Sequence, residues 1–204
     1  MSSVIDQQVR LLAAVAYGEA STANDSDEIG GIAFAVANRC RAWGNKTVSE
    51  LRAADPNYSY AWDGSNARFN KLTRASDKEI EQHSWMKLLV QWAQNAIANK
   101  GSDPSSGAFW WDGLDFKTNY ANHPKVRDGF KWGDPSHNIF DVQEKPREVV
   151  VRWKIKNNKT GKVVDGGERG RYDSVWVSTA AHGNTIFWVR NPGYLQASGG
   201  KTYR

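Results

Sequence analysis

The chain has 204 residues, which suits one domain with a substantial core, and its 40% hydrophobic and 24% charged residues are typical of globular proteins. The net charge of +5 mildly favours an anionic partner, but the basic residues are spread along the sequence, so nucleic-acid binding gains little support. The single cysteine, Cys40, excludes an internal disulfide and a Cys-based zinc site. It falls on the apolar side of a predicted helix, where a small buried hydrophobe is expected.

The start of the chain has no targeting signal that we recognise. Residues 1–10 contain no basic segment followed by an apolar one, so we expect no signal peptide. No apolar run is long enough to span a membrane. Three possibilities follow: a cytosolic protein, export by a route that reads no N-terminal leader, or a domain cut from a longer chain.

The N-terminal half has the apolar periodicity of helices. Ser76 and Glu79 form a capping box, which predicts the start of a long helix. An aromatic stretch, Asn57–Phe69, is expected to be irregular. The predicted helices are Ser3–Tyr17 with Gly18 as its exit, a second helix from N-cap candidates in Asn24–Asp27 to Trp43, Val48–Ala54, and Ser76–Asn99.

The character of the sequence changes after Gly101. Loops around short elements are expected as far as Pro135, and strands beyond Pro146. The Gly-rich segment Asp165–Gly170 is expected to be a hairpin loop or a mobile excursion. The predicted strands are Glu148–Lys156, followed by a turn at Asn157–Gly161, then Ser174–Ser178 and Thr185–Val189.

Helices followed by strands predict an α+β fold rather than an alternating α/β fold. We expect a single domain over residues 1–204. Its helical lobe would cover about 1–100 and its mixed or β-rich lobe about 101–204.

Glu19 is the most informative residue of the N-terminal half. It lies three to seven residues after Leu12, Val15 and Ala16, so its carboxylate falls on the apolar face of the first helix. A helix C-terminus carries partial negative charge, which together with partial burial keeps a carboxyl protonated toward neutral pH. These are the properties of a general acid.

Glu28 stands in the opposite electrostatic environment, in the first turn of the second helix. A helix N-terminus favours an ionised carboxylate. We therefore expect a protonated Glu19 beside an ionised Glu28, which is the arrangement used to cleave glycosidic bonds. The alternative for Glu28 is an ordinary helix-stabilising acid, and Asp25 and Asp27 are expected to serve as caps.

Gly18-Glu19-Ala20, followed by Glu28, Gly30 or Gly31, and Asn38-Arg39, resembles the SleB-like family of spore-cortex and cell-wall hydrolases. Further segments match the family's pattern in the same order. These are Tyr58–Gly64 (an aromatic loop ending in Asp-Gly), Ala93–Trp111 (a helix, Asp-Pro and a Gly-Ala-aromatic box) and His182–Trp188 (the terminal strand), with Asp134–Phe140 as a rival for the last.

The interval between about Asp112 and Ala181 is longer than the family pattern. With the leaderless start, it is similar to muramidase domains of type VI secretion effectors. Such a resemblance implies secretion without a signal peptide, antibacterial action in the periplasm or cell wall of a target bacterium, and a cognate immunity protein as a possible partner. We expect a monomer.

The resemblance implies a lysozyme-like fold that acts on the glycan strands of peptidoglycan without a cofactor. Glu19 would be the catalytic acid for the β-1,4 bond between N-acetylmuramic acid and N-acetylglucosamine. If Glu28 or another carboxylate orients a water or stabilises the cation, the enzyme is a muramidase. If none takes part, Glu19 returns as a base to the muramic 6-hydroxyl and the enzyme is a lytic transglycosylase that gives 1,6-anhydro products.

The aromatic stretch is the best candidate for substrate binding. Aromatic faces stack on the apolar side of a pyranose while neighbouring polar groups bind hydroxyls or acetamido groups. A core position is the alternative for one or more of the aromatic residues, and also for Trp110. The candidate substrate-binding residues are Tyr58, Tyr60, Trp62, Asp63 and Asn66.

Two other classes of function stay open. A non-catalytic peptidoglycan-binding module would use the same aromatic residues and the positive charge, and a nucleic-acid binder has less support. The histidines are scattered without a metal-binding motif, so no metal site is expected; His137 and His182 would be ligands only if folding placed them beside an acid.

Overall fold

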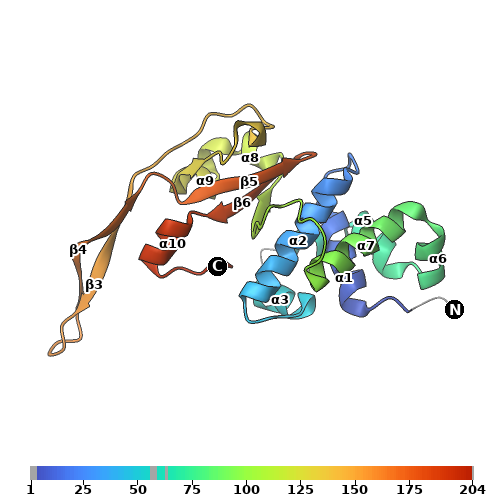
Figure 1. Ribbon diagram of the computed structural model, residues 1–204, viewed down its shortest axis with the longest axis horizontal. Coiled ribbons are helices and arrows are strands. Elements are labelled where there is room, and N and C mark those ends of the chain that lie inside the picture. Colours follow the sequence, from blue (N-terminus) through green and yellow to red (C-terminus); the bar gives the residue numbers. More distant parts are fainter. Residues whose placement is uncertain (1–3, 56–58, 63, 204) are drawn as a thin grey trace.

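A computed structural model describes residues 4–55, 59–62 and 64–203, and at 59 and 60 it describes the backbone alone. Helices occupy one half of the molecule and a small sheet with short helices the other, so the α+β fold is confirmed (Figure 1). The helices are α1 (Gln7–Glu19), α2 (Ser26–Ala42), α3 (Val48–Ala54), α4 (Ser59–Trp62), α5 (Ala67–Arg74), α6 (Asp77–Gln82), α7 (Ser84–Ala98), α8 (Asp115–Thr118), α9 (Pro124–Asp128) and α10 (Pro192–Ser198), with 3-10 turns η2 (Tyr120–Asn122) and η3 (Pro135–His137).

Helix α1 ends two residues later than the sequence predicts. Asp6 caps it by accepting hydrogen bonds from two backbone N–H groups of the first turn. The helix then continues through Gly18 to Glu19, so Gly18 is not its exit. A Cβ at Gly18 would lie 3.2 Å from the Cβ of Ala61 and 3.3 Å from the amide of Asn66. This glycine therefore serves a close approach between segments rather than a turn.

Helix α2 follows the prediction closely and lies at the centre of the fold. Asp25 is its N-cap and accepts a hydrogen bond of 2.7 Å from the backbone N–H three residues later. A Cβ at Gly30 would lie 2.8 Å from the Trp92 ring, and one at Gly31 would lie 2.5 Å from the Phe187 ring. The two glycines thus let helix α7 and strand β6 approach α2 closely at neighbouring positions.

The next helices combine a confirmed prediction with two corrections. Helix α3 has the predicted bounds. Within the described part of Asn57–Phe69, the expected irregular stretch is wrong, because α4 and the start of α5 form there. The expected long helix is also wrong: its capping box opens α6, but His83 is extended (φ −108°, ψ 104°) and separates α6 from α7.

The main sheet has the strand order β1-β6-β5-β2. Strands β5 and β6 form an antiparallel hairpin, β1 pairs with β6, and β2 runs parallel to β5. The strands are β1 (Trp110–Asp112), β2 (Phe130–Lys131), β5 (Trp176–His182) and β6 (Thr185–Arg190).

A second sheet consists of one long hairpin, β3 (Val149–Lys156) and β4 (Val163–Tyr172). The predicted turn at Asn157–Gly161 is confirmed, with the N–H of Gly161 donating to the Asn157 carbonyl at 2.8 Å. The expected loop at Asp165–Gly170 is wrong, because these residues belong to β4. The register between β3 and this glycine-rich strand shifts on both sides of Arg152, as at a β-bulge.

Two hydrophobic cores fill the molecule. The first lies among α1, α2 and α7 and also takes Phe187 from β6, so one face of the main sheet packs on the helices. The second is mainly aromatic and lies within the C-terminal half, where the buried rings of Phe116, Phe130 and Trp188 pack at centroid distances of 5.2–5.6 Å. Many aromatic residues of the C-terminal half therefore serve packing. In the described part of the chain, no helix has both the length and the apolar character needed to cross a bilayer.

Candidate active site

Glu19 lies at the junction of two adjoining cavities. The first cavity measures about 730 Å³ and the second about 530 Å³, and both are lined by Glu19, Gly113 and Thr185. The end of α1, the segment after β1 and the start of β6 therefore meet at this carboxyl group. The first cavity is also lined by polar residues that include Ser21, Thr22, Glu28, Asn66, Arg68 and Asn184.

The Glu19 carboxyl group has the character expected of a general acid. Burial raises its pKa above the ordinary value, and a hydrogen bond from the backbone N–H of Ala61 partly opposes this shift. That N–H donates to Oε1 at 3.1 Å, so in the protonated form the proton belongs on Oε2. The raised pKa confirms the expectation from the sequence, with burial as the main cause.

Glu28 lines the first cavity but is fully buried, and its carboxylate oxygens accept three hydrogen bonds. Ser21 donates from its backbone N–H (3.1 Å) and from its hydroxyl (2.6 Å), and the hydroxyl of Thr185 donates at 2.7 Å. A Cβ at Gly183 would lie 2.5 Å from Glu28 Oε2. Glu28 therefore ties the segment after α1 to the β5–β6 turn, directly beside Glu19.

The structure describes only some of the predicted substrate-binding residues of the aromatic stretch. Tyr58 and Asp63 lie outside the described residues, and so does the side chain of Tyr60. Trp62 is buried, with its ring between the Arg52 guanidinium (4.7 Å) and the Phe69 ring (5.8 Å). Trp62 therefore supports the core.

Asn66 lines the first cavity, as a substrate-binding residue would. Its side chain also caps α5 by accepting from the backbone N–H groups of Arg68 and Phe69, at 3.1 and 3.0 Å. Its amide nitrogen donates to the Gly18 carbonyl at 3.0 Å. These bonds fix the residue next to Glu19, so it shapes the wall of the cavity.

The second cavity contains residues that the sequence did not assign to a site. The Arg39 guanidinium lies 3.9 Å from the centroid of the Trp110 ring. Lys125 Nζ lies 4.8 Å from the Trp176 ring and Arg190 lies 5.2 Å from it. Burial lowers the pKa of Arg190. Aromatic rings and cations thus line the second cavity together with Glu19.

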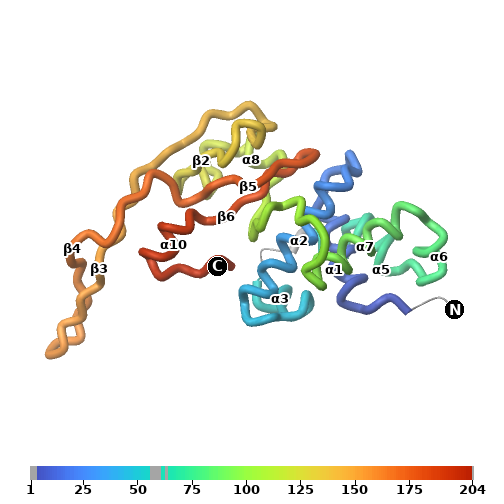
Figure 2. Tube along the Cα trace, in the orientation of Figure 1, coloured from blue at the N-terminus to red at the C-terminus, as the bar shows by residue number. Residues whose placement is uncertain are grey.

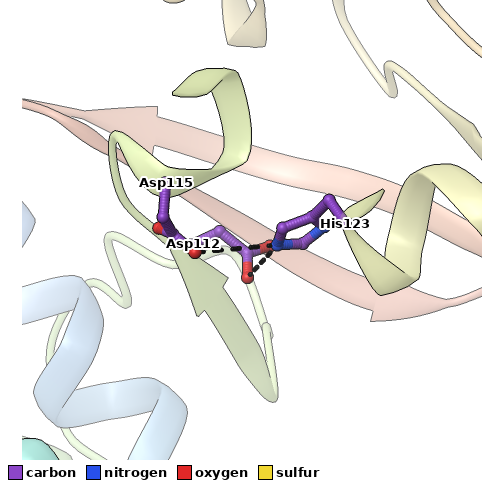
Figure 3. A group of neighbouring side chains, drawn as sticks. All are labelled: Asp112, Asp115 and His123. Atoms are coloured by element: carbon purple, nitrogen blue, oxygen red, sulfur yellow. Dashed lines mark ion pairs between the residues drawn. The ribbon is translucent and has the colours of Figure 1, made fainter. Parts of the chain in front are cut away.

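Asp112, Asp115 and His123 gather in this second cavity, with ligand atoms within 4.8 Å of one another (Figure 3). His123 Nδ1 accepts the backbone N–H of Lys125 at 3.3 Å, so the ring proton belongs on Nε2, which lies 3.3 Å from Asp112. Lys125 Nζ lies 2.8 Å from the same carboxylate. A metal at Nε2 would compete with that proton and that ammonium group, so the bonding favours a hydrogen-bonded network.

The remaining candidates have structural partners. His137 Nδ1 lies 2.8 Å from the Ser178 hydroxyl, and His182 Nε2 lies 2.9 Å from the Pro104 carbonyl. Cys40 is buried, as expected for a small hydrophobe, and burial raises the pKa of its thiol to about 11. Such a thiol is a poor nucleophile at neutral pH.

Comparisons of the chain with protein-family models, curated proteins and solved structures gave no match. The functional conclusion therefore rests on the chemistry of the site and on the sequence pattern around Glu19.

Proposed function

We propose that this protein cleaves the glycan strands of peptidoglycan as a muramidase, with Glu19 as the general acid. The observation that carries this proposal is the position of Glu19. It is a partly buried carboxyl group with a raised pKa, and it lines two adjoining cavities. A polysaccharide cut within its length needs binding space on both sides of the scissile bond.

The two cavities suit different faces of an amino-sugar chain. The first offers amide, hydroxyl and guanidinium groups for hydroxyl and acetamido substituents. The second offers the partly buried rings of Trp110 and Trp111, on which the apolar face of a pyranose could stack. Cations beside those rings suit the carboxylates of the peptide stem that muramic acid carries.

In the proposed reaction, Glu19 Oε2 donates its proton to the glycosidic oxygen as the C1–O bond breaks. The sugar ring develops oxocarbenium character, and the departing chain leaves as an alcohol. Water then adds to C1 and returns a proton to the Glu19 carboxylate, which restores the acid. Glu28 contributes negative charge near the cation and holds Ser21 and Thr185 in place.

Lytic transglycosylase activity is the second candidate, and the burial and hydrogen bonding of Glu28 favour it. Glu28 is fully buried and accepts three hydrogen bonds, so it is poorly placed to orient a water. Without a second carboxylate, the Glu19 carboxylate would take the proton of the muramic 6-hydroxyl as that oxygen attacks C1. The product would then carry an anhydro end instead of a reducing end.

A Glu19→Gln variant tests the proposed acid. Gln cannot donate the proton, so we expect at least a hundredfold loss in the rate of peptidoglycan lysis, measured by turbidity. The thermal midpoint should not fall, because Gln can still accept the Ala61 hydrogen bond and adds no buried charge. Glu81→Gln, at an exposed position, is the matched control and should lyse normally. Undiminished lysis by Glu19→Gln would rule out this assignment.

The resemblance to secreted effectors extends the proposal to the place of action. A periplasmic target predicts that the chain lyses a Gram-negative host when it is expressed with an added periplasmic leader. The same chain should be harmless when it is kept in the cytoplasm. Equal toxicity without the leader would point to a different target. Retention on peptidoglycan without release of soluble fragments would instead indicate a binding module.

A further inference from the structure

The β3–β4 hairpin extends away from both cores as an arm (Figures 1 and 2). Its strands pair only with each other among the described residues, and its base rests on α10, where the rings of Tyr172 and Tyr194 meet at 6.1 Å. The arm is far larger than a simple connection between β2 and β5 requires. Neither cavity beside Glu19 is lined by its residues.

The arm carries the whole excess positive charge of the chain. Residues 149–172 contain 7 Lys and Arg against 2 Asp and Glu, which is a net +5. The full chain has 27 basic and 22 acidic residues, so 20 of each remain outside the arm and the rest of the protein is neutral. Basic residues occur throughout the sequence, but the net positive charge is therefore concentrated in one projecting element.

One face of the arm is apolar and exposed. Ile155 lies directly opposite Val164, and Trp153, two residues earlier on β3, shares their face. These side chains are 54%, 47% and 53% exposed. A Cβ at Gly166 would lie 2.7 Å from Ile155, so the glycine leaves room for that side chain to lie across the strand. Large apolar side chains on a thin two-stranded ribbon are costly in water unless a partner covers them.

Basic side chains lie at the tip of the arm, and one lies beside the apolar face. Lys156, Lys159 and Lys162 are exposed at the tip of the arm, where no acidic residue occurs. The Arg169 guanidinium lies 4.4 Å from the Trp153 ring. On the opposite face, Lys154 forms an ion pair with Asp165. Positive charge is thus least compensated beside the apolar face and at the tip.

We propose that this arm docks on the surface of an anionic lipid bilayer. Lipid phosphates would bind the tip lysines, while Trp153, Ile155 and Val164 would enter the boundary between headgroups and acyl chains. A soluble polyanion would neutralise the lysines but leave the apolar face in water. A bilayer surface offers anionic headgroups and an apolar boundary together. This inference is independent of the chemistry at Glu19.

Cosedimentation with lipid vesicles tests the docking. The intact protein should bind vesicles that contain phosphatidylglycerol and should bind phosphatidylcholine vesicles much less. Substituting Gln for Lys156, Lys159 and Lys162 should weaken binding about a hundredfold, since each basic residue near an anionic surface contributes roughly a factor of five. The same change at Lys78, Lys87 and Lys100, exposed lysines of the helical half, removes equal charge and should have little effect.

Lipid-borne quenchers test the apolar part of the contact. Bromine-labelled acyl chains should quench the fluorescence of the bound protein, and Trp153→Phe should remove most of this quenching while binding persists. Failure to bind anionic vesicles, equal losses in the two lysine variants, or binding without quenching would overturn the proposal. So would retention by soluble dextran sulfate or by an acidic protein when vesicles are ignored.

Discussion

At the residue scale, the proposed activity depends on the proton of Glu19. The sequence indicated this residue because a carboxylate followed an apolar helical face, and in the structure it lines two adjoining cavities. The cause of its raised pKa could be predicted only in part. Burial is the main cause, and it depends on the assembled fold, in which Glu19 lines a cavity with Gly113 and Thr185 from distant parts of the chain.

The raised pKa of Glu19 makes a prediction about activity. A general acid must be protonated, so the rate of cleavage should fall as the pH rises through the raised pKa of Glu19. A pH–rate profile of kcat/KM on soluble glycan fragments measures this descending limb. A rate that stays flat from pH 4 to pH 9 would contradict the role of Glu19.

The same group links stability to pH. Above pH 4.5, the ordinary pKa of a glutamate, the unfolded chain releases this proton while the folded protein retains it. Wild-type stability should therefore decline as the pH rises toward the folded-state pKa, and Glu19→Gln should escape this decline. The thermal midpoint of the variant minus that of the wild type should increase with pH. A difference that shrinks with pH would contradict burial of the ionised form.

At the scale of elements, the sequence predicted what local signals specify. Caps at Asp25 and Ser76 marked helix starts correctly, and the turn at Asn157–Gly161 was found. The break at His83 was missed because no glycine or proline marks it. Helix α10 was missed as well, although Asn191 caps it and Pro192 opens it.

The paired glycines of α2 give a prediction at this scale. Gly31→Ala would place a methyl group 2.5 Å from the Phe187 ring, so we expect a loss of about 1–3 kcal/mol in the free energy of unfolding, measured with urea. Phe187→Leu should relieve part of this loss in the double variant, because the smaller side chain leaves room. Full additivity of the two changes would show that the close contact does not limit stability.

At the scale of the whole molecule, Arg39 joins the two halves. It is buried, forms an ion pair with Asp55 at the end of α3, and donates to the Tyr203 carbonyl near the C-terminus at 2.8 Å. Its guanidinium also covers Trp110 of the main sheet. The sequence pattern placed Arg39 on a helix but could not reveal these contacts, because their partners come from three distant segments.

Removal of Arg39 should therefore destabilise the whole fold. We expect Arg39→Ala to cost about 3–5 kcal/mol, since it takes away the guanidinium that compensates the buried charge of Asp55. The double variant Arg39→Ala/Asp55→Ala should be less destabilised than the sum of the single variants, and urea unfolding measures each. Simple additivity would show that loss of the ion pair with Asp55 does not account for the destabilisation.

The second cavity also belongs to this scale. Its residues come from α2, β1, α9, β5 and β6, so only the assembled fold brings Arg39, Trp110 and Lys125 to one side of Glu19. The sequence could predict Glu19 and Glu28 as candidate residues. It could not predict the other residues that line the second cavity.

Mass spectrometry of peptidoglycan digested by the purified protein identifies the bond that is cut. We expect soluble disaccharide-peptide fragments cut between N-acetylmuramic acid and N-acetylglucosamine, with none above background from the Glu19→Gln protein. Hydrated reducing ends would identify a muramidase, and anhydro ends a lytic transglycosylase. Intact glycan strands after digestion, or fragments cut only within the peptides, would contradict the proposed activity.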